Sequence, residues 1–169
     1  EVAPMVTEAV ELVEIELRRR NVRLSHYVAA RLPALMVDPI LIEQVLVNLM
    51  KNAAESVDNA QRPAAQRSVE LRVVPRTVDA QSVVEFNVTD SGRGLPPQTM
   101  GRLYEAFFST KAEGMGIGLN LCRSIVESHA GRIEAQNLYN ADEIVGCRFS
   151  FWIPVHAQLP AEKPTEVSP

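Results

Sequence analysis

The residues best suited to do chemistry lie between Asp90 and Leu119. Asp90 ends an apolar run and is followed by Gly92 and Gly94, while a second glycine cluster spans 114–119 and opens a helical sequence. Glycine lets backbone amides approach a ligand closely, and the unpaired N–H groups of a helix start favour phosphate. The pattern predicts a nucleotide site with Asp90 at the base and the second cluster at the phosphates. A lone glycine cluster, in contrast, is more often an ordinary loop.

Asp90 has the same strand parity as Val84, Phe86 and Val88, which alternate with more polar residues. Its carboxylate is therefore expected on the covered face of a sheet, where burial is costly unless hydrogen bonds compensate it. An amino group of a ligand would satisfy the carboxylate. A structural aspartate bonded to backbone N–H groups is the alternative.

Two asparagines, Asn48 and Asn52, lie four positions apart in a predicted helix that opens with Asp38 and Pro39. Asparagine is a poor residue for the middle of a helix, so an aligned pair beside an apolar stripe needs a reason. Amide oxygens suit Mg²⁺, a hard cation that also binds phosphates. The alternative is a pair of exposed or core-bonded amides.

The remaining candidates, Phe107, Phe108 and Lys111, lie between the two glycine clusters. The phenylalanines would belong to the core or seat a lid. Lys111 would be solvated or would reach a phosphate.

Composition narrows the class of protein. The 169 residues, 46% hydrophobic and 22% charged, fit one globular domain with a real core. The net charge of −4 argues against nucleic-acid binding. No run approaches the ~18 apolar residues of a membrane helix and no signal peptide is visible, so we expect no membrane contact by this fragment. The two cysteines indicate no disulfide framework, and the three histidines have no metal-ligand spacing.

The chain starts without Met, in helix-like sequence, and so reads as a fragment of a longer protein that could carry a membrane anchor elsewhere. The pattern predicts these elements in order: a helix over 2–20, strands over 22–29 and 34–37, a helix from 39, a loop over 58–68, strands over 69–74 and 83–89 joined by 75–82, a short helix over 96–103, a helix over 118–130, and a hairpin of 132–138 with 147–153.

Four motifs in this order resemble the catalytic ATP-binding domain of bacterial sensor histidine kinases, in the superfamily shared with gyrase and MutL. They are an N box over 38–56 with its central run at 48–53, a first glycine box at 90–94, an F box at 107–111 and a second glycine box at 114–119. The resemblance covers residues 1–155. It implies a Bergerat-type α/β (α+β) two-layer sandwich, with a mixed sheet of about five strands and three main helices on one face. Residues 156–169 are expected to form a Pro-rich, disordered tail.

The resemblance also implies roles. Asp90 would accept a hydrogen bond from adenine, Gly92 and Gly94 would shape the adenine side, and Asn52 with Asn48 would serve Mg²⁺. The lid and its phosphate contacts would come from Ser109, Thr110, Lys111, Gly114, Met115, Gly116, Ile117, Gly118 and Leu119.

Four positions depart from common patterns of this family. Glu55 and Ser56 replace a frequent Lys-Tyr pair, which makes Lys111 more important. Ala106 replaces a frequent proline, and Cys147 replaces a threonine that helps to bind adenine through water.

The activity that the resemblance implies is phosphoryl transfer from Mg-ATP to a histidine on a separate helical dimerisation domain, and then to a response regulator in the cytoplasm. Asn48, Asn52 and Lys111 would be catalytic. His26, His129 and His156 lie in no acceptor motif.

Two alternatives stay open. An ATP hydrolase of the same superfamily would carry, at the position of Asn48, a glutamate that acts as general base, and an amide cannot accept that proton. A scaffold that binds nucleotide without catalysis would be marked by a broken box, and all four boxes are intact.

Overall fold

The computed structural model describes residues 1–96 and 116–155. Its elements are α1 (Val2–Arg19), β1 (Arg23–Val28), α2 (Pro39–Ala60), the short 3₁₀ turn η1 (Ala64–Gln66), β2 (Ser68–Val78), β3 (Gln81–Asp90), α4 (Gly116–Ser128), β4 (Arg132–Asn140) and β5 (Glu143–Pro154).

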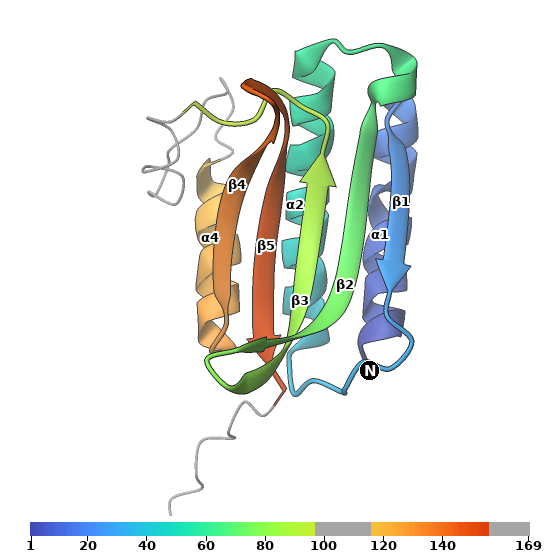
Figure 1. Cartoon of the computed structure of the whole chain (residues 1–169). Helices are drawn as coiled ribbons and strands as arrows, with labels where there is room; N and C mark the ends of the chain where they lie inside the picture. Colours follow the sequence, from blue (N-terminus) through green and yellow to red (C-terminus); the bar gives the residue numbers. More distant parts are fainter. Residues whose placement is uncertain (97–115, 156–169) are drawn as a thin grey trace, which may run out of the picture.

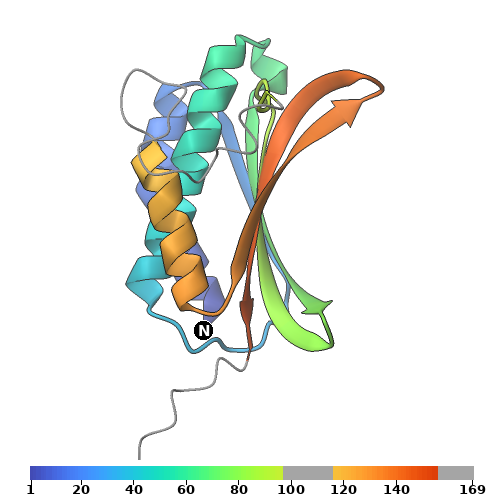
Figure 2. The same cartoon turned by 90° about the vertical axis from the view of Figure 1, so that its left-hand side faces the viewer.

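The strands form one five-stranded sheet in the order β1-β2-β3-β5-β4 (Figure 1). β1 pairs parallel with β2, and the other neighbours are antiparallel. Figure 2 shows α1, α2 and α4 together on one side of the sheet. The predicted two-layer sandwich with a mixed sheet and helices on one face is therefore confirmed.

The core lies between the helix layer and the inner face of the sheet. The helical spacing of Val6, Val13 and Leu17 places these side chains in the core, where each is fully buried. From the sheet, Phe86 of β3 stacks on Phe151 of β5 with ring centroids 4.6 Å apart. The alternation predicted for β3 is thus realised, and β5 continues the same apolar face.

The start of α2 is held from two sides. Asp38 is the predicted N-cap, and its Oδ1 accepts hydrogen bonds from the backbone N–H groups of Ile40 and Leu41. The backbone N–H of Asp38 in turn donates to His129 Nε2 at 3.2 Å, while His129 Nδ1 lies 2.8 Å from the carbonyl oxygen of Ile125. His129 is therefore a helix-end residue that ties α4 to α2.

Two element predictions are wrong. Residues 34–37 form no strand: Leu35 and Val37 pack against the core, but the backbone here pairs with no described strand. The predicted loop from Asp58 instead begins with the last turn of α2, which runs to Ala60. A carboxylate such as that of Asp58 is unfavourable in the last turn of a helix, because this end of the helix dipole is negative. Arg20 and Arg67 offset this cost, since each forms an ion pair with the Asp58 carboxylate at 2.8 Å.

The connection predicted over 75–82 is also wrong. β2 and β3 continue through this segment and turn at Asp79 and Ala80, both with positive φ as a tight hairpin requires. Pro75 does not interrupt β2 because β1 pairs with β2 only as far as Val73. The missing N–H of Pro75 therefore lies on a free edge.

Several predictions fall outside the described residues, among them the short helix over 96–103 beyond its first residue and the tail at 156–169. No helix in the described ranges has both the length and the apolar character needed to cross a bilayer.

Candidate functional site

The candidate site is built around Asp90, the last residue of β3. Asp90 pairs with Val69 of β2 and with Cys147 of β5, so it lies in the interior of the sheet. Only 5% of the residue is exposed. The Asp90 carboxylate accepts a hydrogen bond of 2.8 Å from the backbone N–H of Gly92 and another from the backbone N–H of Cys147. Asp90 thus lies on the covered face that strand parity predicts. Its backbone partners are those expected of a structural aspartate, the alternative left open by the sequence.

The two backbone bonds do not offset the burial of this acid. Desolvation raises the pKa of Asp90 to about 6, and the N–H groups of Gly92 and Cys147 only partly oppose this rise. A buried carboxylate held at a cost in this way is typical of a functional site.

The segment after β3 passes directly over α2. A Cβ atom at Gly92 would collide with Ser56 of α2 and would lie 2.9 Å from Asp90 Oδ1. Gly94 has φ +71°, and a Cβ there would lie 2.6 Å from Asn137 Oδ1. Both glycines are therefore required by the backbone, which explains the first glycine cluster without reference to a ligand.

Asn48, Asn52 and Ser56 follow one another at four-residue spacing along one side of α2. Asn48 lies against α4, where its side chain hydrogen-bonds the Cys122 thiol. Ser56, the last of these three residues, lies against Gly92. The site is thus framed by α2, the end of β3 and the first turns of α4.

Asn52, between them, has a buried Oδ1 with no hydrogen-bond partner among the described residues. A buried carbonyl oxygen left without a partner is rare and requires an explanation. A hard cation would supply the missing partner, because such cations prefer oxygen ligands. The Asn48 side chain hydrogen-bonds the Cys122 thiol, and its role in the metal site beside Asn52 stays a prediction.

Two further side chains contact the segment after β3, and neither was singled out from the sequence. Asn137 of β4 accepts from the backbone N–H of Leu95 at 2.8 Å and donates to the Leu95 carbonyl oxygen at 2.6 Å. Arg62, just beyond α2, donates to three backbone carbonyls, among them those of Ser91 and Gly92. Neither residue has a local sequence signal, because both act on distant segments.

β5 closes the site from the far side of β3. A Cβ at Gly146 would collide with the carbonyl oxygen of Asp90, so only glycine allows this approach. The strand predicted over 147–153 begins one residue too late to include Gly146; in a strand extended through it, an isolated glycine would have signalled close backbone approach. Next to it, burial raises the pKa of the Cys147 thiol to about 12, with a further rise from the Asp90 charge. A neutral, buried thiol therefore stands opposite Asp90.

The second glycine cluster is described only in part. Gly118 and Leu119 lie in the first turn of α4, where Leu119 packs partly buried against the core. Gly116 and Ile117 also belong to α4. The remaining predicted site residues lie outside the described residues: Ser109, Thr110, Lys111, Gly114 and Met115.

A family model described as "Histidine kinase-, DNA gyrase B-, and HSP90-like ATPase" matches residues 37–157. The chain is 37% identical over 133 residues to the C4-dicarboxylate transport sensor protein DctS of Rhodobacter capsulatus, covering 79% of this chain and 19% of DctS. It is 37% identical over 150 residues to the sensor protein FixL of Bradyrhizobium diazoefficiens, covering 89% of this chain and 28% of FixL. It thus spans less than a third of the length of these relatives.

Solved structures agree in fold. The catalytic domain of the histidine kinase ThkA superposes with a TM-score of 0.70 at 27% identity, over 92% of this chain and 94% of that domain. Full-length ShkA in complex with AMPPNP superposes with a TM-score of 0.73 over 91% of this chain and 30% of ShkA. At 22% identity, the ShkA likeness shows the fold alone.

Proposed function

The chain belongs to the family of histidine kinase-, DNA gyrase B- and HSP90-like ATPases, as a catalytic domain of the histidine kinase type, and from this premise we propose how its site works. In this proposal the site binds Mg-ATP with the base at Asp90 and the metal at Asn52. The domain, over residues 1–155, then presents the γ-phosphoryl group to a histidine on a separate protein segment.

Asp90 is the observation that carries the proposal. A carboxylate that is 5% exposed, with a pKa raised to about 6, keeps a charge in the interior at a cost to the fold. Its two backbone N–H partners leave hydrogen-bonding capacity on the carboxylate, because an ionised carboxylate has about four acceptor sites. The exocyclic amino group of adenine is a donor that would use this capacity.

The metal fits Asn52 on the strength of its unpartnered Oδ1. When bound, Mg²⁺ would neutralise charge on the phosphates as they are transferred. This chain would hold the metal through Asn52. One helical turn earlier, Asn48 would brace α2 against α4 through its hydrogen bond to Cys122. Lys111 and the second glycine cluster stay predicted as the phosphate contacts.

Transfer to a histidine needs an acceptor that the described residues do not offer. His26 lies exposed on the edge strand β1. Both ring nitrogens of His129 have backbone partners, the N–H of Asp38 before α2 and the carbonyl oxygen of Ile125 in α4. We therefore place the acceptor on a helical dimerisation domain of the full-length kinase, from which a response regulator would receive the phosphoryl group. As the catalytic part of such a kinase, the chain would work in the cytoplasm.

A calorimetric titration of the chain with ATP, with and without Mg²⁺, tests the binding step. We expect micromolar-range binding, on the order of −7 to −8 kcal/mol, that Mg²⁺ strengthens. Labelled ATP mixed with the chain and its helical dimerisation domain then tests transfer, and we expect acid-labile label on that domain. Absence of ATP binding both with and without the helical domain would refute the proposal.

A further inference from the structure

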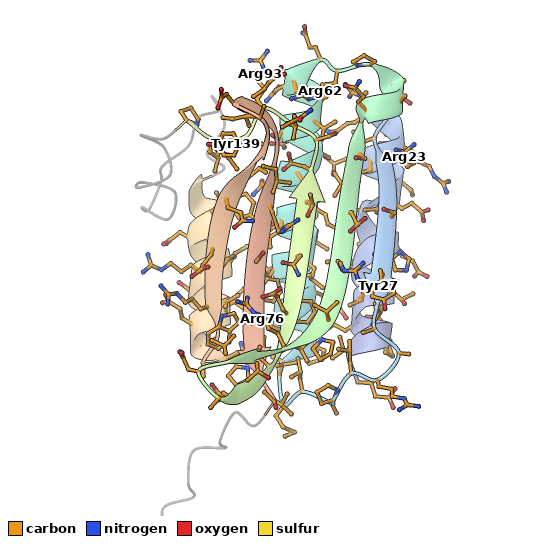
Figure 3. All side chains as sticks on the ribbon, viewed as in Figure 1. Arg23, Tyr27, Arg62, Arg76, Arg93 and Tyr139 are labelled. Atoms are coloured by element: carbon orange, nitrogen blue, oxygen red, sulfur yellow. The ribbon has the colours of Figure 1, made fainter. Side chains whose placement is uncertain are left out.

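Arg62 joins two segments that are far apart in the sequence. Its Nε donates to the Ser91 carbonyl oxygen at 2.7 Å, and its Nη2 donates to the carbonyl oxygens of Gly92 at 3.2 Å and Ile144 at 3.3 Å. Ser91 and Gly92 follow β3, whereas Ile144 lies at the start of β5. Figure 3 shows Arg62 at the end of the molecule where β3 ends.

A guanidinium suits this task because its donors are arranged in a rigid, planar fork. A charged donor forms stronger hydrogen bonds to backbone carbonyls than a neutral donor such as water does. One guanidinium therefore holds these three carbonyls more firmly than water molecules would. Among the described residues, no carboxylate forms an ion pair with Arg62. Its hydrogen bonds there serve the backbone instead.

The bond to Gly92 has a direct consequence for Asp90. The carbonyl of Gly92 is held by Arg62, while its N–H donates to Asp90 Oδ1. Arg62 therefore holds the residue that orients the buried carboxylate. Asn137 fixes the other end of the same segment through both polar groups of Leu95.

We infer that Arg62 is a positioning residue for the base end of the site. It holds the segment 91–95 so that Asp90 presents its free oxygen lone pairs to the base of the nucleotide. This inference rests on the proposed function, because the base is that of ATP. The inference goes beyond the proposed function because it assigns the shape of the base site to Arg62, a residue outside the four motifs.

The test compares three single variants of the chain. Arg62→Met removes the guanidinium and keeps the length of the stem, and Arg62→Lys keeps the charge without the fork. Arg132→Met is the matched control, because Arg132 is an exposed arginine of β4 that forms an ion pair with Glu134. Hydrogen exchange of the amides at 92–95 is measured without nucleotide, and the Kd values for ATP and GTP are measured by calorimetry.

For Arg62→Met we expect amide exchange at 92–95 to become about tenfold faster, and the Kd for ATP to rise by about tenfold. The preference for ATP over GTP should fall, because a loosened base site discriminates less between bases. Arg62→Lys should lie between Arg62→Met and the parent, since one ammonium cannot reproduce the planar fork. Exchange in β2 and β3 should not change.

Exchange and Kd values equal to those of Arg132→Met would overturn the inference. So would faster exchange throughout the sheet with an unchanged ATP:GTP ratio, because Arg62 would then only stabilise the fold. If the parent bound no ATP either alone or with its helical domain, the proposed function would fail. The exchange of segment 91–95 would then still decide whether Arg62 holds it.

Discussion

Asp90 makes the stability of this fold depend on pH in an unusual direction for an acid. Its pKa rises from 3.8 to about 6 on folding because burial disfavours the charged form. The folded state therefore binds the proton more tightly than the unfolded state. The stabilising contribution is full below about pH 4 and is lost as the pH rises through about 6. The change corresponds to roughly 3 kcal/mol, an order-of-magnitude figure.

Asp90→Asn should therefore stabilise the chain while abolishing its proposed function. The amide oxygen can still accept from the N–H of Gly92, but no charge is buried. At pH 8 we expect the free energy of unfolding to rise by about 1–3 kcal/mol, with no difference from the parent near pH 4. Urea unfolding at both pH values, with an ATP titration at pH 8, measures this. ATP binding as tight as that of the parent would favour the scaffold alternative.

Asn52→Ala should separate metal binding from stability. Because Asn52 Oδ1 has no protein partner in the described structure, its removal breaks no hydrogen bond there, and we expect unfolding to change by less than about 1 kcal/mol. The gain in ATP affinity on adding Mg²⁺ should disappear. Asn59→Ala, an exposed asparagine on the same helix, is the control and should keep that gain. Magnesium dependence retained in Asn52→Ala would remove this residue from the metal site.

Sequence reasoning reached the site residues that carry a local signal and missed those that act across the fold. Asp90 was found from strand parity and Asn52 from an amide in an apolar helix. Arg62 and Asn137 contact residues that only the sheet pairing brings near them. No spacing along the chain predicts such partners.

At the scale of elements, the end of β3 is confined between two others. α2 approaches through Ser56 at Gly92, and β5 approaches through Gly146 at the Asp90 carbonyl. The site is thus shaped by how closely backbones can meet, and glycine sets that distance at both contacts.

Gly146→Ala should consequently destabilise the chain and weaken nucleotide binding together. The new methyl group meets backbone rather than a movable side chain, so we expect a loss of about 2 kcal/mol or more. Gly118→Ala provides the contrast, because nothing lies within 4 Å of its Cβ position in α4. It should raise stability by about 0.5–1 kcal/mol. Equal midpoints in urea for the two variants would contradict this account.

An element was predictable where its hydrophobic periodicity and a capping residue indicated the same start. In α2, for example, the helical spacing of apolar residues begins just after the N-cap Asp38. Elements were not predictable where tertiary partners decide. The last turn of α2 persists because Arg20 and Arg67 hold Asp58, and β2 passes Pro75 because its edge is free there. Both reasons depend on segments distant in sequence.

At the scale of the whole molecule, this fold does not by itself choose between phosphoryl transfer and hydrolysis, because one architecture can host several reactions. The choice depends on whether a base can activate water beside the phosphates. The position at issue is Asn48, one helical turn before Asn52. Its amide hydrogen-bonds the Cys122 thiol and cannot accept a proton from water.

We therefore expect negligible steady release of phosphate from ATP by the unmodified chain, measured with a coupled phosphate assay. Asn48→Glu would place a carboxylate at that position and should raise the release at least about tenfold, since a positioned base contributes about 10²–10⁴-fold when fully aligned. Asn48→Gln has the same length without the acid and is the matched control. Both variants lengthen the side chain beside Cys122 and only one brings an acid, so a rise in Asn48→Glu alone assigns the effect to the carboxylate. Steady turnover by the parent, in contrast, would make the domain a hydrolase in its own right.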